Sequence, residues 1–473
     1  MTRCVQGGLW LLLTVAVGSA IGCRTHQAPG APTWPGIALT PQDRLLILAP
    51  HPDDEVICCG GLIQQAIARQ LPVRVVFLTY GDNNEWSFLL YRKHPIFFPS
   101  SIRRMGLLRH EEAIAASRVL GLSPEHLVFL GYPDFGTLNI WNSHWRDRPP
   151  FHSMLTRAAQ VPYANAMHPG APYKGEAVLN DLTTILREFR PTKVFVSHPG
   201  DYMPDHRALY LFTRVALWNL EQEMHPEVYP YLVHFKRWPK PRRYDPTRWL
   251  EPPRVFAHSV AWQTHRLQPA EVEQKRLALR AHRTQYGYSA QYLLSFVKPN
   301  ELFGDFPVVT LPGSALPSML SPDGQQHVQD PPEELTDEER AAFVGLEWRY
   351  ARLEGRDLVV SVKFSRPLAK NVAVSVFIFG YRKNRPFEQM PKLHVQLGAF
   401  GYALYDQDQL LSKQSVTVTR EPTHITLRVP LQMLGDPERI LTSARSYLSE
   451  VPLDWVSWRI LQLPHVSTAP AAP

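Results

Sequence analysis

Four short, nearly uninterrupted apolar runs constrain the fold of this chain more than any other feature. The first is Leu45–Ala49, and the others lie at 73–79, 127–130 and 194–196. Strands without polar residues at alternate positions are typical of a parallel sheet that is covered on both faces. Segments with helical spacing separate or follow these runs, at 61–70, 103–120, 176–189 and 206–220. The alternation predicts an α/β fold with a Rossmann-like, mostly parallel sheet and helices on both faces.

A second domain is predicted in the C-terminal third. The chain has 473 residues, which is long for one domain, and its 44 prolines favour linkers. We expect an α/β domain over 43–306, a proline-rich linker over 307–340, and an all-β sandwich over 341–473. The predicted strands of the sandwich are 358–364, 372–379, 393–397, 416–418, 423–429 and 455–463. Its Tyr447, Trp455 and Trp458 either stack on a carbohydrate or belong to the core.

The N-terminal residues have the layout of a bacterial export signal. Arg3 precedes an apolar stretch, and small residues then lead to Cys23. Because the residues before Cys23 resemble a lipobox, we expect a signal peptide over 1–22, a lipid on Cys23 and a tether over 23–42. There are two alternatives: cleavage of the signal before Cys23 without lipidation, or a signal that stays uncleaved as a membrane anchor. These features predict a membrane-anchored lipoprotein of the cell envelope, in the periplasm or at the cell surface.

Charge and motifs exclude several classes of protein. The net charge of +7 is small for this length, and no nucleic-acid-binding motif surrounds the basic, aromatic segment 225–255. We therefore expect no nucleic-acid partner and interpret 225–255 as a wall of the substrate cleft. The sequence has no GxSxG or HExxH motif, and carboxylates stand where a dinucleotide-binding fold needs glycines. Four cysteines build neither a disulfide framework nor a four-cysteine zinc site of the CxxC type.

Histidine and aspartate side chains follow two of the predicted strands. They are His51, Asp53 and Asp54 after the first strand, and His198, Asp201, Asp205 and His206 after the fourth. Because the carboxyl ends of parallel strands meet at one edge of a sheet, the two groups should converge. Two imidazoles and one carboxylate can hold a divalent cation and leave a position for water. The pattern therefore predicts a catalytic metal site.

These residues resemble the signature of the LmbE/PIG-L-like metal-dependent N-deacetylases. That signature is a strand followed by PHPDDE, here Pro50–Glu55, and a later strand followed by HPxD and PDH, here beginning at His198 and ending at His206. The resemblance covers roughly 43–303 and leaves out the C-terminal sandwich. It implies that His51, Asp54 and His206 bind Zn²⁺, or another divalent metal such as Fe²⁺.

The same resemblance implies roles for further residues. Asp53 would be the general base, and Arg109, Asp134 and His282 would contact the substrate. The reaction would be hydrolysis of the N-acetyl group of an N-acetylglucosamine-type sugar or glycoconjugate, with release of acetate. Asp201 and Asp205 would orient the metal-bound imidazoles.

The chain departs from the family pattern at one position. Many members have a histidine where this chain has Met203, and a thioether cannot donate a hydrogen bond to an oxyanion. We assign that role to His198, with a side chain of the 225–255 segment as the alternative.

Two other functions fit part of the pattern. His51 and Asp53 with a distant histidine could be the facial triad of a non-haem iron oxygenase, which would require a jelly-roll fold. A non-catalytic, metal-containing lipoprotein that binds glycans is the second alternative.

Overall fold

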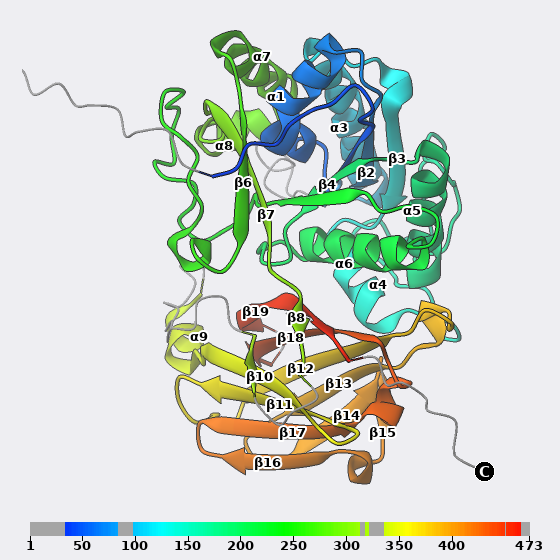
Figure 1. Cartoon of the computed structure of the whole chain (residues 1–473), viewed down its shortest axis with the longest axis vertical. Helices are drawn as coiled ribbons and strands as arrows, with labels where there is room; N and C mark the ends of the chain where they lie inside the picture. Colours follow the sequence, from blue (N-terminus) through cyan, green and yellow to red (C-terminus); the bar gives the residue numbers. More distant parts are fainter. Residues whose placement is uncertain (1–33, 84–97, 313–316, 321–334, 450, 465–473) are drawn as a thin grey trace, which may run out of the picture. The chain divides into compact units, whose positions relative to one another are not determined.

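A seven-stranded sheet forms the first part of the chain in the computed structural model (Figure 1). The structure describes residues 34–83, 98–312, 317–320, 335–449 and 451–464. The strands of this sheet are β1 (Leu45–Ala49), β2 (Val73–Thr79), β3 (Leu127–Tyr132), β4 (Lys193–Ser197), β5 (Glu227–Tyr231), β6 (Ala261–Arg266) and β7 (Asn300–Asp305). Their order is β3-β2-β1-β4-β5-β7-β6. β3, β2, β1, β4 and β5 are parallel, whereas β7 pairs antiparallel with both β5 and β6.

Helices cover both faces of this sheet, as the sequence predicts. They are α1 (Asp54–Ala68), α3 (Pro99–Val119), α4 (Thr137–Ser143), α5 (Gly175–Phe189), α6 (Pro204–Asn219), α7 (Pro269–Ala281) and α8 (Arg283–Leu294). Figure 1 shows α1, α3 and α7 on one face and α5 and α6 on the other, and helices of each group contact one another. The α/β fold class is confirmed.

Two differences from the predicted elements matter for the site. α1 begins at Asp54 rather than at residue 61, with Asp54 and Glu55 in its first turn, where the helix dipole favours carboxylates. The basic segment 225–255, for which no strand was predicted, contains β5 (Glu227–Tyr231), which pairs with β4. The five residues EVYPY of β5 have no apolar run that would have revealed the strand.

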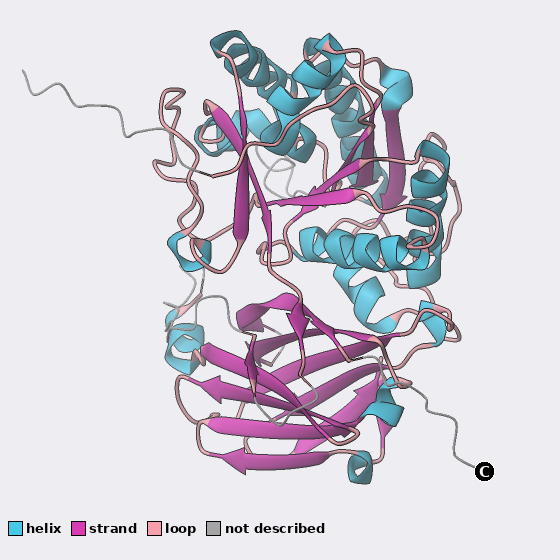
Figure 2. Cartoon of the chain, viewed as in Figure 1, coloured by secondary structure: helices cyan, strands magenta, loops and turns pink. Residues whose placement is uncertain are grey.

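The C-terminal part consists of two further sheets (Figure 2). One has the order β16-β17-β11-β10-β9 and the other β15-β14-β13-β12-β18-β19-β8. The strands are β8 (Val309–Thr310), β9 (Ser318–Met319), β10 (Leu346–Glu354), β11 (Asp357–Phe364), β12 (Val372–Tyr381), β13 (Lys392–Leu397), β14 (Tyr402–Asp406), β15 (Gln409–Leu411), β16 (Thr417–Glu421), β17 (His424–Pro430), β18 (Arg439–Leu448) and β19 (Val451–Gln462), and a short helix α9 (Asp337–Ala342) precedes β10. Apolar residues from both sheets form one core, which confirms the predicted sandwich.

The sandwich also packs against the α/β part. Residues from Thr33 onward form one compact unit, and one buried apolar cluster contains side chains of both parts. The ring of Trp141 after β3 lies 5.2 Å from that of Phe387 and 6.5 Å from that of Trp458. Trp458 and Tyr447 are therefore buried packing residues, whereas Trp455 is half-buried.

The predicted targeting segment lies mostly outside the described residues. This applies to the signal peptide 1–22, to Cys23 and to the first part of the tether. The last part of the tether is packed, because Ile37 is buried and its N–H donates to the carbonyl of Thr264 at 2.9 Å. Within the described ranges, no helix has the length and apolar character that a membrane span requires.

Candidate metal centre

The loop between β1 and α1 presents three side chains at the edge of the sheet. The N–H of His51 donates to Asp54 Oδ2 at 3.0 Å, which closes the loop. Asp53 between them has φ 127°, a left-handed backbone conformation that a non-glycine residue rarely adopts. Its N–H donates to Glu55 Oε2 at 2.8 Å, which helps to hold this conformation. Strain of this kind concentrates at functional sites.

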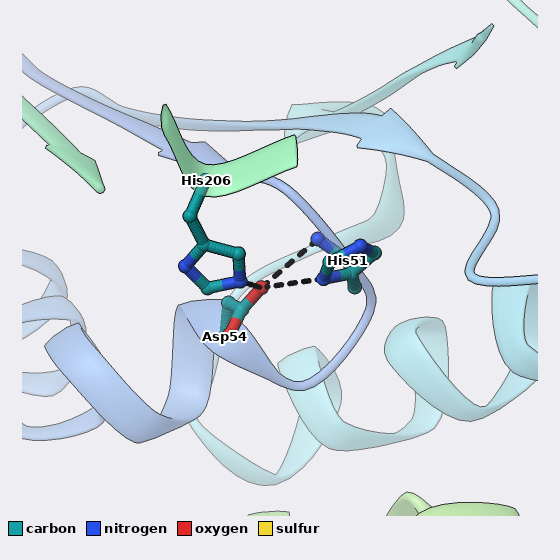
Figure 3. Close-up of side chains that lie close together, drawn as sticks. All are labelled: His51, Asp54 and His206. Carbon is teal, nitrogen blue, oxygen red and sulfur yellow. Dashed lines mark hydrogen bonds and ion pairs between the residues drawn. The ribbon is translucent and has the colours of Figure 1, made fainter. Parts of the chain in front are cut away.

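The first turn of α6 brings His206 to the same place. Its Nε2 lies 3.2 Å from Asp54 Oδ2, and Nδ1 of His51 lies 3.3 Å from the same oxygen (Figure 3). The two imidazole rings are 5.2 Å apart between centroids. Ligand atoms of His51, Asp54 and His206 thus lie within 4.8 Å of one another, and all three residues are buried.

This cluster is suited to a cation. His206 is fully buried, yet neither of its ring nitrogens has a hydrogen-bond partner in the described part of the chain. The carboxylates beside them, Asp54 and Asp201, are close enough for charge attraction but not in hydrogen-bond geometry. Buried polar atoms without partners are rare, and two imidazoles with one carboxylate form a donor set typical of catalytic zinc.

A second group, His51 with Asp134 and Asp205, is a weaker candidate for the same ion. Nε2 of His51 lies 3.0 Å from Asp134 Oδ1 and 3.2 Å from Asp205 Oδ2. Asp205 already accepts hydrogen bonds from the N–H of Phe135, the N–H of Thr137 and the hydroxyl of Thr137. Its oxygens are therefore occupied, and its role is to hold His51 and the loop after β3 in place.

The carboxylates around the cluster favour positive charge on its imidazoles. Burial lowers the pKa of His206, but Asp201 and Asp54 outweigh it and raise the pKa to about 9. Burial also opposes a charged His51, yet Asp134, Asp205 and Asp54 raise its pKa well above the usual value. A divalent cation that displaces these protons would meet the same attraction.

Comparison with known proteins finds a family model that is similar to this part of the chain. Residues 46–217 match the model described as PIG-L: GlcNAc-PI de-N-acetylase. This segment is PIG-L-like. The matched residues include β1, the loop with His51 and Asp54, and the first turn of α6 with His206. The 225–255 segment and the sandwich lie outside the match.

Curated relatives of the PIG-L-like segment are deacetylases by name. A 1D-myo-inositol 2-acetamido-2-deoxy-alpha-D-glucopyranoside deacetylase of Mycobacterium sp. (strain KMS) is 30% identical over 37% of this chain and 50% of the relative. The corresponding deacetylase 1 of Saccharopolyspora erythraea is 30% identical over 38% of this chain and 55% of its own. The chain thus spans about half the length of these relatives. Among solved structures, N,N'-diacetylchitobiose deacetylase from Pyrococcus horikoshii is 20% identical, with a TM-score of 0.35 over 55% of this chain and 82% of its own.

Arg109 on α3 holds the loop between β1 and α1 in place. Its guanidinium donates to the carbonyls of Pro52 and Gly81, each at 2.7 Å, and lies 3.6 Å from Asp53 Oδ2. The guanidinium fits only because residue 81 is glycine, since a Cβ there would lie 2.2 Å from Nη1. Arg109 also lines the cavity described below, so it can both position Asp53 and face a ligand.

Asp53 has the environment of a proton carrier. Burial raises the pKa of its carboxyl to about 7, although the charge of Arg109 acts in the opposite direction. Asp53 lines a cavity of about 580 Å³ together with His51 and Asp134. The side chains that line this cavity therefore include the predicted base, the predicted metal ligand His51 and the predicted substrate contacts Arg109 and Asp134.

The structure does not bring His198 to this cavity. Its ring is fully buried among aromatic side chains, with centroids 4.9 Å from Phe306, 5.5 Å from Phe256 and 5.9 Å from Trp262. Burial lowers its pKa to about 3. Its Nδ1 accepts the N–H of Gly200 at 3.0 Å, so the ring closes a turn and has no path to a ligand in the cavity. The assignment of His198 as a catalytic residue is withdrawn.

A residue of the 225–255 segment, His234, occupies the place that His198 was expected to fill. Its ring centroid lies 4.9 Å from that of His206, and it lines the cavity. Asp201 holds it there, because Asp201 Oδ2 accepts the N–H groups of Val233 and His234 at 3.0 and 2.8 Å. No sequence motif marks His234, although the segment that contains it was the alternative to His198.

His282 also lies elsewhere than expected. It sits at the junction of α7 and α8, fully buried, and its Nε2 pairs with Glu55 Oε1 at 3.0 Å. Glu55 in turn accepts the N–H of Asp53. His282 is therefore a positioning residue behind the loop and not among those lining the cavity, which on that side is lined by Gln285, Tyr288 and Ser289.

His206→Ala is expected to abolish stoichiometric binding of a divalent cation, because the two ligands that remain, His51 and Asp54, are too few to hold the ion. The measurement is metal content per chain after loading with Zn²⁺ and extensive dialysis. His198→Asn is the matched control: it follows the same strand, its amide oxygen can still accept from Gly200, and it should retain the ion. One ion per chain in His206→Ala would place the metal somewhere else.

Proposed function

We propose that this chain is a zinc-dependent N-deacetylase that hydrolyses the N-acetyl group of an N-acetylglucosamine-type sugar or glycoconjugate. The observation that carries the proposal is the cluster of His51, Asp54 and His206 with Asp53 beside it at a cavity. The match of residues 46–217 to PIG-L and the names of the curated relatives support the same reaction.

The zinc ion would be held by His51, Asp54 and His206, and when bound it would acidify a water molecule and polarise the amide carbonyl. Asp53 would take a proton from the attacking water as the new bond from oxygen to the carbonyl carbon forms. It then gives a proton to the nitrogen as the bond from carbon to nitrogen breaks, so that acetate and a free amine leave. Arg109 fixes the Asp53 loop through the carbonyl of Pro52 during both transfers.

His234 supplies the hydrogen bond that Met203 cannot donate. Burial lowers the pKa of His234 to about 4, so the ring is neutral and carries one N–H. The hydroxyl of Tyr292 donates to the carbonyl of Val233 at 2.8 Å and also lies 3.3 Å from Nδ1 of His234, so the ring proton resides on Nε2 only when this hydroxyl turns to donate to Nδ1. In that tautomer, the N–H at Nε2 stabilises the negative charge that develops on the carbonyl oxygen.

The oxygenase alternative fits the structure less well. A facial triad of His51 and Asp53 with a distant histidine would need Asp53 in the cluster and a jelly-roll fold, whereas Asp54 occupies that place in an α/β fold. Two histidines and a carboxylate also accept Fe²⁺, so the native metal is to be identified by metal analysis of protein purified without added ions.

Acetate release tests the proposal. The zinc-loaded chain is incubated with a panel of N-acetylated mono- and oligosaccharides, beside Asp53→Asn. Release by the wild type that the variant loses would establish the activity and rank the substrates. No release from any sugar, with zinc bound, would overturn the proposed substrate class.

We also propose that the protein is exported and anchored at the cell envelope by a lipid on Cys23. The export signal and the residues before Cys23 support this. Cys23→Ser is expected to move the protein from the membrane fraction to the soluble fraction of cells that express it. Unchanged fractionation and no incorporation of labelled palmitate in the wild type would contradict the anchor.

A further inference from the structure

A second cavity opens beside the metal cluster, between the α/β part and the sandwich. It has a volume of about 560 Å³ and shares its lining residues Phe135, Met203, His234, Arg242 and Tyr292 with the cavity over the cluster. We call it the sandwich cavity. A ligand whose reacting group lies near Asp53 can therefore extend into it without leaving the protein.

The lining of the sandwich cavity is strongly basic. It includes the side chains of Arg207, Lys236, Arg237, Arg242 and Arg445, and no aspartate or glutamate is among the described residues that line it. Arg207 comes from α6, Arg242 from the 225–255 segment, and Arg445 from β18 of the sandwich. Three separate parts of the fold thus direct positive charge to one space.

The charge of Arg207 is poorly compensated by the protein. Its side chain is 9% exposed, its Nε has no hydrogen-bond partner among the described residues, and Nη2 reaches only the carbonyl of Tyr202 at 3.4 Å. A buried cation without a close carboxylate is costly, and an anion in the cavity would remove that cost.

Arg445 is in a similar position on the other side. Its Nε has no hydrogen-bond partner in the described ranges, and its guanidinium lies against the rings of Phe377 and Tyr447 at 5.4 and 5.3 Å. Among the described residues, no carboxylate lies within ion-pair distance of Arg207, Arg242 or Arg445. Guanidinium groups bind phosphate, sulfate and carboxylate with paired hydrogen bonds.

An aromatic surface stands next to these cations. Trp455 on β19 is the direct cross-strand partner of Arg445 on β18. The guanidinium of Arg207 lies 5.1 Å from the centre of the Trp455 ring, and Tyr202 packs against its edge at 4.7 Å. The N–H of Trp458 donates to the carbonyl of Pro199, which ties β19 to the loop after β4. The sandwich is therefore fixed at the catalytic edge of the sheet, and it contributes the guanidinium of Arg445 and the indoles of Trp455 and Trp458 to the cavity lining.

We propose that the sandwich cavity binds an acidic group of the substrate, so that the preferred substrate is an N-acetylated amino sugar joined to a residue with a carboxylate, phosphate or sulfate. The acidic group pairs with Arg207, Arg242 and Arg445, and its sugar ring packs on Trp455. This inference rests on the proposed function for the reaction, but the binding it describes does not require turnover. It gives the sandwich a role in substrate selection.

Binding to the zinc-loaded, full-length Asp53→Asn protein tests the proposal without hydrolysis. The acidic probes are a hyaluronan tetrasaccharide, N-acetylglucosamine 1-phosphate and N-acetylglucosamine 6-sulfate, and the neutral probes are chitotetraose with N-acetyl groups and N-acetylglucosamine. Calorimetry should show that at least one acidic probe binds about 10- to 100-fold more tightly than its neutral counterpart. The preference should fall as the salt concentration rises, as expected for ion pairs.

Variants of the cavity residues test which side chains cause the preference for acidic probes. Arg445→Gln in the same background should remove most of it and leave binding of the neutral probe unchanged, whereas Arg420→Gln on the exposed side of the sandwich should keep it. If Arg445→Gln does not fold, the exposed Arg242→Gln takes its place. Equal binding of acidic and neutral probes, or a preference that survives both cavity variants, overturns the inference.

Acetate release distinguishes this result from failure of the proposed function. Acidic probes that bind through Arg445 but are never deacetylated by the wild type would overturn the deacetylase and leave the acidic-ligand site standing. Deacetylation of neutral sugars only, with no effect of Arg445→Gln on KM, would support the deacetylase and overturn the acidic-ligand site.

Discussion

Asp53→Asn is expected to lower kcat for acetate release by about 10²- to 10⁴-fold, because the amide of asparagine cannot take the proton of the attacking water. The cluster of His51, Asp54 and His206 does not include Asp53, so the variant should keep its metal ion. Asparagine also tolerates the left-handed backbone that Asp53 adopts, so the loop should be preserved. The measurement is kcat on the best substrate of the panel, with metal content determined on the same samples.

Asp54→Asn is the matched control for this prediction. It changes the neighbouring carboxylate in the same way, but it weakens a metal ligand, so it should lose zinc together with activity. If Asp53→Asn hydrolyses at the rate of the wild type while His206→Ala loses the ion, the metal is structural. The chain would then be a metal-containing glycan-binding protein, and the deacetylase proposal would fail.

Most of the α/β fold could be predicted because its signals are local. Leu45–Ala49 and Val73–Thr79 are apolar enough to identify buried strands by composition alone. β5 was not predicted because its sequence EVYPY has no apolar run, although Tyr229 and Tyr231 are buried and the strand pairs with β4. α7 and α8 are separate helices, and His282 at the break between them pairs with Glu55, which lies far away in the sequence.

The metal ligands could also be predicted, whereas the place of His198 away from the cavity could not. His51, Asp54 and His206 are placed by strand ends and by the first turn of α6, which the sequence marks. His198 directly follows β4, and its N–H still donates across to the carbonyl of Tyr231 on β5 at 2.7 Å, while its carbonyl accepts the N–H of Asp201 at 3.0 Å and so begins a turn. That turn places the ring against Phe256, Trp262 and Phe306, and no pattern near residue 198 indicates those partners.

The sandwich cavity could not be predicted either, because it depends on contacts between residues far apart in the sequence. Arg207, Arg242 and Arg445 are separated by long stretches of sequence and meet only because β19 is tied to the loop after β4. The basic character of the 225–255 segment was visible, and its placement as a wall of the cleft agrees with the two cavities that it lines. The contribution of the sandwich was not visible, since a single arginine and a single tryptophan on adjacent strands form no motif.

His234→Ala is expected to lower kcat by about 10²- to 10³-fold, the usual cost of losing a hydrogen-bond donor to an oxyanion. The physical reason is that His234 is the imidazole at the cavity near His206, while Met203 has no donor. KM should change little, because the lost bond strengthens only as charge develops on the carbonyl oxygen. Steady-state kinetics on the best substrate, with zinc content measured in parallel, provide the check.

His198→Asn separates this role from a general effect of histidine loss, and it should retain activity close to that of the wild type. Tyr292→Phe should lower kcat less than His234→Ala does, because it removes a hydroxyl 3.3 Å from Nδ1 of His234 but leaves the imidazole ring in place. Introducing the missing histidine as Met203→His in the His234→Ala background should recover part of the lost rate, since position 203 lines both cavities. If His198→Asn instead loses the activity and His234→Ala retains it, the ring among the aromatic residues must reach the substrate after all, and the loop after β4 would have to rearrange when substrate binds.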